Sequence, residues 1–320
     1  MSRIIFIDAH RVEQLLDYPD LVAGLKDLHQ ADMDVMEDLL LEQPGATGTA
    51  THFFFRAAWQ RHQAMGVKLV TIFPDNPGAT GLPAIQGIYV LFDGSDGSLK
   101  AVIDGTALTW RKTAADSALG ASYLAREDVE HLLMVGAGAM AAPLIAAHRA
   151  VRPSIGQVSI WNRDSARATK LADALSVSGV KAVATTDLEA AARQADIICC
   201  ATRVTTPLIK GEWLQPGCHL DLVGAFTKTM READDEAMRR GNIYVDSRKT
   251  TVGEIGEILL PMEAGVITEH DILGDLYDLC RNTVAGRRTR DEITIFKNGG
   301  GGHLDLMTAE ILVSRIENDA

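Results

Sequence analysis

The chain has 320 residues, of which 47% are hydrophobic, and a formal net charge of −12. This length suits two domains with a sizeable core. The negative charge excludes nucleic acids and anionic membranes as partners, because both bind basic surfaces. A small anionic ligand stays compatible with it, since a few basic residues in a cleft can hold one.

Four cysteines, Cys199, Cys200, Cys218 and Cys280, lack the spacing of a metal site, and three of them fall in apolar strand-like runs. We therefore expect reduced thiols in the core, no metal ion and a cytoplasmic protein. The apolar run at the N-terminus is short and includes Asp8, which is atypical of a secretory signal. No apolar run in the sequence is long enough to span a membrane.

The first 125 residues predict a mixed α+β domain. A short strand at 4–8 precedes a helix from about Asp20 to Leu41, where apolar residues recur at helical spacing. Strand-like runs and a closing helix follow, in the order 52–60, 66–74, 85–94, 99–105 and the alanine-rich helix Thr106–Ala125. The DGSDGS stretch predicts a hairpin turn, because a calcium loop would need spaced ligands and a closing Glu.

Residues 131–143, HLLMVGAGAMAAP, form the clearest motif in the chain. An apolar strand runs into Gly136 and Gly138, and an alanine-rich helix follows. In a dinucleotide-binding domain the first glycine makes the turn and the second lets the backbone approach a pyrophosphate. A third small residue, here Ala141, packs the helix on the strand. A glycine pair between strand and helix is also ordinary turn chemistry, but the alternation that follows favours the cofactor motif.

Strands and helices alternate from this motif onward, with further strands predicted at 157–163, 181–186, 196–202, 218–226 and 242–247. Asp164 is placed to cap the helix after the first of these. A last strand at 292–298 leads through four glycines into an amphipathic C-terminal helix. The pattern predicts an α/β fold: a Rossmann-type doubly wound parallel sheet of six strands, preceded by the α+β domain.

The end of the second predicted strand of this sheet bears on the choice between NADH and NADPH. An NAD-specific site places an Asp or Glu here, whereas this chain has Trp161, Asn162 and Arg163. No carboxylate would repel a 2′-phosphate, and Arg163, helped by Ser165 or Arg167, is suited to bind one. We expect NADPH to be preferred, with NADH possible. The alternative, in which Asn162 replaces the acid and Arg163 is a solvated surface charge, stays open.

Basic residues also occur upstream, namely Arg56, Lys68, and Arg111 with Lys112. A lysine in an apolar strand needs a partner or a ligand unless it lies on a solvent-facing side, and for Lys68 both readings stay open. Arg111 and Lys112 are expected at the start of a helix, where cations are unfavourable unless an anion is also present. His52, in a strand of aromatics, is expected to be packed or paired rather than an acid.

The combination of motifs resembles the ornithine cyclodeaminase and μ-crystallin family. The segments that carry the resemblance are GVKLVTIFPDN, RKTAADSALGASYLAR, LLMVGAGAMA, VSIWNR, HLDLVGAFTKTMREADDE and DEITIFKN, in that order. It implies a homodimer whose N-terminal substrate and dimerisation domain, residues 1–125, is completed by the C-terminal helix in 297–320. Residues 126–296 would then form the NAD(P)-binding domain.

The resemblance also implies roles for individual residues. Lys68 would contact the substrate carboxylate or imine, while Lys112 and Thr113 would lie beside the cofactor phosphates. Where the chain departs from the family at the substrate end, carboxylate binding would be rebuilt around Arg56, Lys68 and Arg111. The loop after Phe296 would approach the nicotinamide. The cofactor would be lined by the turn Gly136, Ala137, Gly138, Ala139 and Met140, by Asn162, Arg163 and Arg167, and by the strand ends Ala201, Thr202, Gly224 and Ala225.

Two departures from the family pattern bear on the reaction. Cyclodeaminases carry an Asp after the paired small residues of the fifth strand, where this chain has Phe226 and Thr227. A phenyl ring cannot exchange a proton, and VGAFTKTMRE resembles instead the branch that reduces cyclic ketimines such as Δ1-pyrroline-2-carboxylate and Δ1-piperideine-2-carboxylate. The arginines usual at the substrate end are also absent, one of them replaced by Lys112, which allows an acyclic substrate or a second carboxylate.

We therefore predict an NADPH-dependent enzyme that transfers a hydride to the imine carbon of a cyclic 2-imino acid and yields the L-amino acid. An ornithine cyclodeaminase, an amino acid dehydrogenase, a reductase of an acyclic imine such as iminosuccinate, and a non-catalytic NADPH binder remain as alternatives. The proton donor is not identified by the sequence. Thr227, His303, Asp305 and a bound water are the candidates.

Overall fold

A computed structural model of the chain describes residues 4–45 and 47–318. The chain divides into two compact units, one of residues 1–112 with 301–320 and the other of residues 113–300. The division falls inside helix α4 (Gly105–Leu124) and just before helix α12 (Gly302–Asn318), whereas the boundaries expected from the sequence were 125/126 and 296/297. Among the described residues, no helix is both long and apolar enough to cross a membrane.

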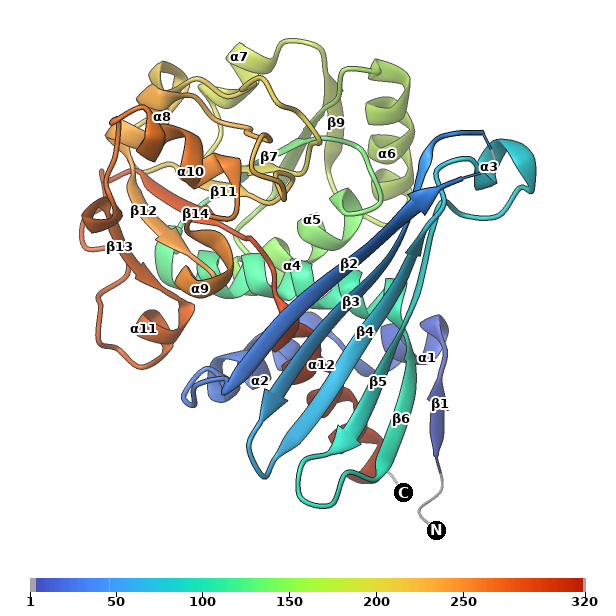
Figure 1. Cartoon of the computed structure of the whole chain (residues 1–320). Coiled ribbons are helices and arrows are strands. Elements are labelled where there is room, and N and C mark those ends of the chain that lie inside the picture. Colours follow the sequence, from blue (N-terminus) through green and yellow to red (C-terminus); the bar gives the residue numbers. More distant parts are fainter. Residues whose placement is uncertain (1–3, 46, 319–320) are drawn as a thin grey trace. The chain divides into compact units, whose positions relative to one another are not determined.

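The first unit is built on a six-stranded sheet in the order β1-β6-β5-β4-β3-β2 (Figure 1). Its neighbouring strands are antiparallel except β1, which pairs in parallel with β6. The elements of this unit besides α4 and α12 are β1 (Ile5–Ile7), α1 (Ala9–Leu15), α2 (Tyr18–Leu28), β2 (Val35–Pro44), β3 (Ala50–Gln60), β4 (Ala64–Ile72), α3 (Asn76–Ala79), β5 (Ile85–Asp93) and β6 (Leu99–Asp104). The predicted hairpin turn through DGSDGS joins β5 to β6 and is confirmed.

Helix α12 packs on this sheet over β3, β4 and β5, and it also packs against α2. Side chains alternate between the two faces of a strand, so every second residue of β3, β4 and β5 lies on the face that α12 covers. Leu91, Ala101 and Leu304 are among the fully buried residues of this layer. The C-terminal helix therefore completes the core of a unit that is otherwise made by the start of the chain.

The helix expected from Asp20 to Leu41 is wrong in its second half. Helix α2 ends at Leu28, and the chain from Val35 to Pro44 forms β2, which pairs with β3 over its whole length. A short apolar run does not by itself distinguish a helix from a strand. The hydrogen bonds to β3, the next strand in the chain, decided the outcome, and the apolar pattern within 35–44 does not record that pairing.

The second unit contains an eight-stranded, entirely parallel sheet in the order β13-β12-β14-β11-β10-β7-β8-β9. Its strands are β7 (His131–Val135), β8 (Gln157–Trp161), β9 (Ala182–Thr185), β10 (Ile197–Cys200), β11 (His219–Leu222), β12 (Asn242–Val245), β13 (Ile272–Asp275) and β14 (Thr294–Lys297). The helices are α5 (Ala141–Val151), α6 (Ser165–Val177), α7 (Leu188–Ala192), η1 (Gly211–Trp213), α8 (Asp235–Arg240), α9 (Arg248–Thr251), α10 (Gly256–Glu263), η2 (Glu269–Asp271) and α11 (Leu276–Cys280).

The predicted Rossmann-type doubly wound parallel sheet is confirmed, but it has eight strands where we expected six. Strand β13 was missed, and β14 inserts between β11 and β12. Strands β10 and β11 are buried along their whole length, and all four cysteines are buried and outside disulfides, as expected. The predicted cap of α6 is also confirmed, because the Asp164 carboxylate accepts a hydrogen bond from the amide of Ala166.

Candidate active site

Two buried lysines and one buried aspartate lie together in the first unit. The Nζ atom of Lys68 on β4 is 2.9 Å from Oδ2 of Asp305 on α12, and Nζ of Lys112 on α4 is 3.7 Å from Oδ1 of the same carboxylate. The three side chains are 7%, 3% and 0% exposed. Lys68 is therefore buried and paired, and the reading that placed it on a solvent-facing side of its strand is wrong.

Local structure explains how these groups meet. Ala64, Gly66 and Lys68 alternate onto the buried face of β4, which is the face that α12 covers. Asp305 belongs to the first turn of α12, where a carboxylate is favoured by the helix dipole. Lys112 comes from the second turn of α4, because that helix begins at Gly105.

Burial and charge set the protonation of this cluster. Burial lowers the pKa of Lys68 to about 8, although the charge of Asp305 opposes the shift. Burial by itself would raise the pKa of Asp305, but Lys112 and Lys68 outweigh it and hold that pKa below its usual value. Burial, reinforced by His29 and Lys112, places the pKa of His303 well below its usual range. Asp305 is thus ionised and His303 neutral near pH 7.

The two predicted arginines are each already engaged. Arg56 is the cross-strand neighbour of Lys68, and its Nη2 and Nε donate to Asp38 at 2.6 and 3.0 Å. The guanidinium of Arg111 lies 4.8 Å from the centre of the Tyr18 ring and donates to a main-chain carbonyl. The expectation that Arg111 and Lys112 start a helix is wrong, because a full turn of α4 precedes them.

The other predicted residues of this region fall as follows. The carbonyl of Thr113 accepts a hydrogen bond from Nδ2 of Asn298 at 3.0 Å. The Phe226 side chain, which stands where cyclodeaminases have an acid, is 55% exposed. His52 pairs with Glu42 at 2.9 Å, which confirms the expected paired histidine.

The glycine turn after β7 has the geometry that a dinucleotide needs. Gly136 has a φ of +113°, and a Cβ atom there would lie 2.7 Å from the carbonyl oxygen of Ala201. A Cβ on Gly138 would have no atom within 4 Å, so this position lies beside open space. Met140, the N-cap residue of α5, makes no side-chain capping bond. The helix N-terminus can therefore offer amide groups to a pyrophosphate.

The end of β8 supports this turn. Oδ1 of Asn162 accepts a hydrogen bond from the amide of Ala137 at 3.2 Å, and its Nδ2 donates to the carbonyl of Asp164 at 2.9 Å. Arg163 and Arg167 are exposed, and Arg167 pairs with Asp164 at 3.5 Å. In the described parts of the chain, Arg163 makes no side-chain hydrogen bond or ion pair and is free to meet a ligand.

The ends of β10 and β11 are held by a residue that the sequence reasoning missed. The buried carboxylate of Glu232 accepts hydrogen bonds from the amides of Thr202 and Gly224 at 2.7 and 2.6 Å, and from the Thr202 hydroxyl at 2.6 Å. It also accepts a longer bond, 3.4 Å, from the amide of Ala225. Glu232 stands in an acidic run that reads as an ordinary surface helix, so the sequence carries no clear signal for it.

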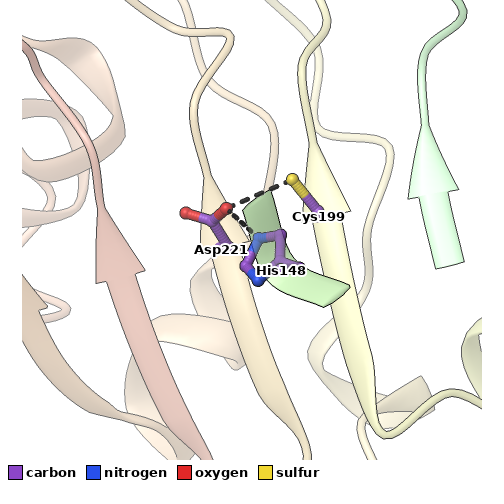
Figure 2. A group of neighbouring side chains, drawn as sticks. All are labelled: His148, Cys199 and Asp221. Atoms are coloured by element: carbon purple, nitrogen blue, oxygen red, sulfur yellow. Dashed lines mark hydrogen bonds and ion pairs between the residues drawn. The ribbon is translucent and has the colours of Figure 1, made fainter. Parts of the chain in front are cut away.

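A second buried carboxylate, Asp221, was also missed (Figure 2). Its Oδ2 lies 2.9 Å from Nε2 of His148 and accepts a hydrogen bond from Sγ of Cys199 at 3.1 Å, while its Oδ1 accepts one from Ser117 at 3.0 Å. Burial, followed by Asp221, raises the pKa of Cys199 well above its usual value. The sulfur therefore keeps its proton, which suits a hydrogen-bonded core better than a thiolate metal ligand.

The first unit thus contains a buried cation cluster. The second contains a glycine turn, an uncapped helix N-terminus, and two strand ends joined by the hydrogen bonds of Glu232 at the carboxyl edge of a parallel sheet. These features fit a nicotinamide dinucleotide. The fold and the site define the chain as an NAD(P)-dependent enzyme of the oxidoreductase class.

Comparison with known proteins gives the family. The model of the ornithine cyclodeaminase/mu-crystallin family matches residues 55–319, and the chain belongs to this family. A Δ1-pyrroline-2-carboxylate reductase of Paracoccus denitrificans is 47% identical over 93% of this chain and 92% of its own. A reductase of the same name from Colwellia psychrerythraea is 34% identical over 97% and 98%.

Solved structures agree with this assignment. The Δ1-pyrroline-2-carboxylate reductase of Thermococcus litoralis, in complex with NADH and L-proline, superposes with a TM-score of 0.89 at 26% identity, over 99% of this chain and 98% of that one. The resemblance found in the sequence, including its reductase branch, is therefore confirmed.

Proposed function

We propose that this enzyme reduces Δ1-pyrroline-2-carboxylate and Δ1-piperideine-2-carboxylate to the corresponding L-amino acids, with NADPH as the hydride donor. The observation that carries the proposal is the buried group of Lys68, Lys112 and Asp305. Two ammonium groups and one carboxylate leave one net positive charge in the interior. A buried net charge is unfavourable unless it is compensated, and the single carboxylate of a cyclic imino acid supplies the compensation.

The cofactor carries the hydride, and the protein binds and orients the substrate. Lys68 and Lys112 would hold the substrate carboxylate, and so turn the encounter of imine and cofactor into an oriented step. The reaction also needs a proton on the imine nitrogen. Asp305 is ionised and His303 is neutral, so neither suits the task. Lys68, with its pKa lowered to about 8, can release a proton near neutral pH and is our choice of donor.

The preference for NADPH rests on the end of β8. No carboxylate stands there, Asn162 is used within the turn, and Arg163 is exposed. A guanidinium in that place binds a 2′-phosphate. The Thermococcus reductase holds NADH, so the two cofactors must be compared directly on this chain.

A homodimer is supported by the uncovered face of the six-stranded sheet. Leu39, Leu41, Phe53 and Ile88 are 54%, 49%, 38% and 42% exposed, and the strand register places them on the face opposite Lys68. A contiguous apolar face of this kind marks an association surface, and a second copy of the chain is the occupant we propose. The four buried cysteines, none of them in a disulfide, accord with the reducing cytoplasm.

The test is an absorbance assay of reduced-nicotinamide oxidation, with NADPH and NADH side by side. The substrates are Δ1-pyrroline-2-carboxylate, Δ1-piperideine-2-carboxylate and iminosuccinate, and ornithine with NAD+ is scored for ammonia. We expect oxidation of NADPH by the cyclic imines and no ammonia from ornithine, because Phe226 cannot act as a base. Ammonia release would establish the cyclodeaminase alternative instead. Activity confined to iminosuccinate would assign a second carboxylate to the cluster around Arg56.

A further inference from the structure

Glu232 connects two strands that otherwise end independently. Its Oε1 accepts from the amide and the hydroxyl of Thr202, two residues after the end of β10, and its Oε2 accepts from the amide of Gly224, two residues after the end of β11. All of these contacts lie at the carboxyl edge of the parallel sheet. In doubly wound folds this edge is where the ligand binds.

Close contacts and further hydrogen bonds hold the link that Glu232 makes between the two strand ends. A Cβ atom on Gly224 would collide with the backbone of Thr202 and with Glu232 itself, so the two strand ends are in close contact. Glu232 is held in turn, because Oε2 of Glu257 accepts from its amide at 2.7 Å and Oε1 accepts from the next amide at 3.0 Å. The buried ammonium of Lys297 donates to the carbonyl of Leu222 at 2.8 Å and offsets part of the negative charge.

The bond from Thr202 to Glu232 also orients one polar group of the edge. The Thr202 hydroxyl has a single proton, and that proton is given to Oε1 of Glu232 at 2.6 Å. Its lone pairs are therefore left for other partners, so this hydroxyl can accept a hydrogen bond from a ligand but cannot donate one. A nicotinamide carboxamide carries a suitable NH2 donor.

We propose that Glu232 is a positioning residue for the nicotinamide cofactor: it fastens the ends of β10 and β11 to each other and keeps the Thr202 hydroxyl as an acceptor toward the cofactor. The inference rests on the proposed binding of NADPH at this edge and extends it to a residue that does not touch the ligand. The role requires a carboxylate. Both oxygens of Glu232 face donors, so the NH2 group of a glutamine would oppose an N–H or O–H group in either orientation.

The experiment is a double-mutant cycle on cofactor affinity, measured by NADPH fluorescence in the absence of any imine. Thr202→Val removes the bond between the two side chains and Thr202→Ser keeps it, whereas Glu232→Gln sets an NH2 group against the donors of one of the two strand ends. Glu189→Gln, on the exposed face of α7 where the carboxylate pairs with Arg193, is the matched control. We expect Thr202→Val and Glu232→Gln each to raise the Kd for NADPH about tenfold, the loss typical of one charge-assisted hydrogen bond.

The expected signature is non-additivity. The double variant should bind NADPH about as well as Glu232→Gln alone, because both changes act through one contact, and Thr202→Ser and Glu189→Gln should bind like the unmodified protein. Additive losses, or an unchanged Kd in Thr202→Val, would overturn the proposal. Should Glu232→Gln fail to fold, Glu232→Asp takes its place, because a carboxylate one methylene shorter cannot reach the donors of both strand ends, and an unchanged Kd in that variant would also overturn the proposal. Because the measurement contains no imine, its result can be interpreted even if the enzyme does not have the proposed reductase activity.

Discussion

The Nζ atom of Lys68 lies 2.9 Å from the carboxylate of Asp305, and both side chains are buried. One residue comes from the fourth strand of the chain and the other from its last helix. Neither charge would be stable alone in the interior, because an unpaired buried ion is strongly unfavourable. The pair keeps a cation in a place from which water is largely excluded, where its attraction for an anionic substrate is strongest.

Replacement of Lys68 by alanine should abolish imine reduction. We expect kcat/KM for the imine to fall by roughly 10²–10³-fold, the usual loss for a preorganised charged group, while the Kd for NADPH stays within about twofold. Steady-state assays and cofactor fluorescence measure the two quantities. Lys100→Ala, on β6 of the same sheet but paired with Asp93 near the surface, is the control. Turnover unchanged in Lys68→Ala would remove that residue from the active site.

The activity should also depend on pH through Lys68. The pKa of this residue is about 8 in the folded protein, against an ordinary 10.5, so the ammonium form is present below pH 8 and is lost above it. We expect kcat/KM for the imine to decline above about pH 8 and the Kd for NADPH to stay constant over the same range.

Lys68 should also make the stability depend on pH, in the direction opposite to the activity: the activity falls as pH rises, whereas the free energy of unfolding increases. Between about pH 8 and 10.5 the unfolded chain binds the proton and the folded chain does not. The contribution of this residue to the free energy of unfolding therefore increases as pH rises through that window. Urea unfolding of the unmodified protein and of Lys68→Met, compared across the window, measures the contribution. An alkaline activity limb that survives in an active Lys68→Arg variant would assign the titration to another group.

Cofactor choice should respond to the two residues after β8. Arg163→Ala should weaken NADPH about tenfold and leave NADH unchanged, because only NADPH has a 2′-phosphate for the guanidinium to bind. Asn162→Asp should shift the preference toward NADH, since the new carboxylate repels the phosphate and can bind the ribose. Dissociation constants for both cofactors check this. Equal effects of Arg163→Ala on NADPH and NADH would identify Arg163 as a solvated surface charge.

The two glycines of the turn should behave differently when each is replaced by alanine. Gly136 has a φ of +113° and lies against the carbonyl of Ala201, so Gly136→Ala should lower the free energy of unfolding by roughly 1–3 kcal/mol. Gly138 has open space around its Cα, so Gly138→Ala should keep the stability but weaken NADPH at least tenfold, because the methyl group lies where the pyrophosphate must approach. Thermal unfolding and cofactor titration separate the two. Unchanged cofactor affinity in Gly138→Ala contradicts the proposed cradle.

Asp221 should matter for stability. It binds Ser117, His148 and Cys199 together in the core. Asp221→Asn places an NH2 group against the donors that surround Asp221, so we expect the free energy of unfolding to fall by about 3 kcal/mol, as when buried donors to a charged group lose their acceptor. Urea unfolding measures the change, and Asp173→Asn on the exposed face of α6 serves as the control. A urea midpoint equal to that of the control would show that the cluster contributes nothing.

Local sequence patterns predicted much of the fold. The apolar run His131–Val135, the glycine pair after it and the capping Asp164 each predict their structure from neighbours along the chain. Strand β2 and the insertion of β14 between β11 and β12 escaped this reasoning. Both depend on hydrogen bonds to other strands, and the pattern within one segment contains no information about such partners.

The sequence by itself determined the class of the cofactor and the family and singled out the cationic residues Lys68 and Lys112, because these depend on residue types at short spacings. Only the tertiary structure decided that Lys68 and Lys112 share Asp305, and that Glu232 fastens Thr202 to Gly224. Burial determines the role that each carboxylate has in the folded protein. In the sequence Asp305 is one of several candidate proton donors and Glu232 is an ordinary acidic residue, and both become structural anions once the fold removes them from water and surrounds them with donors.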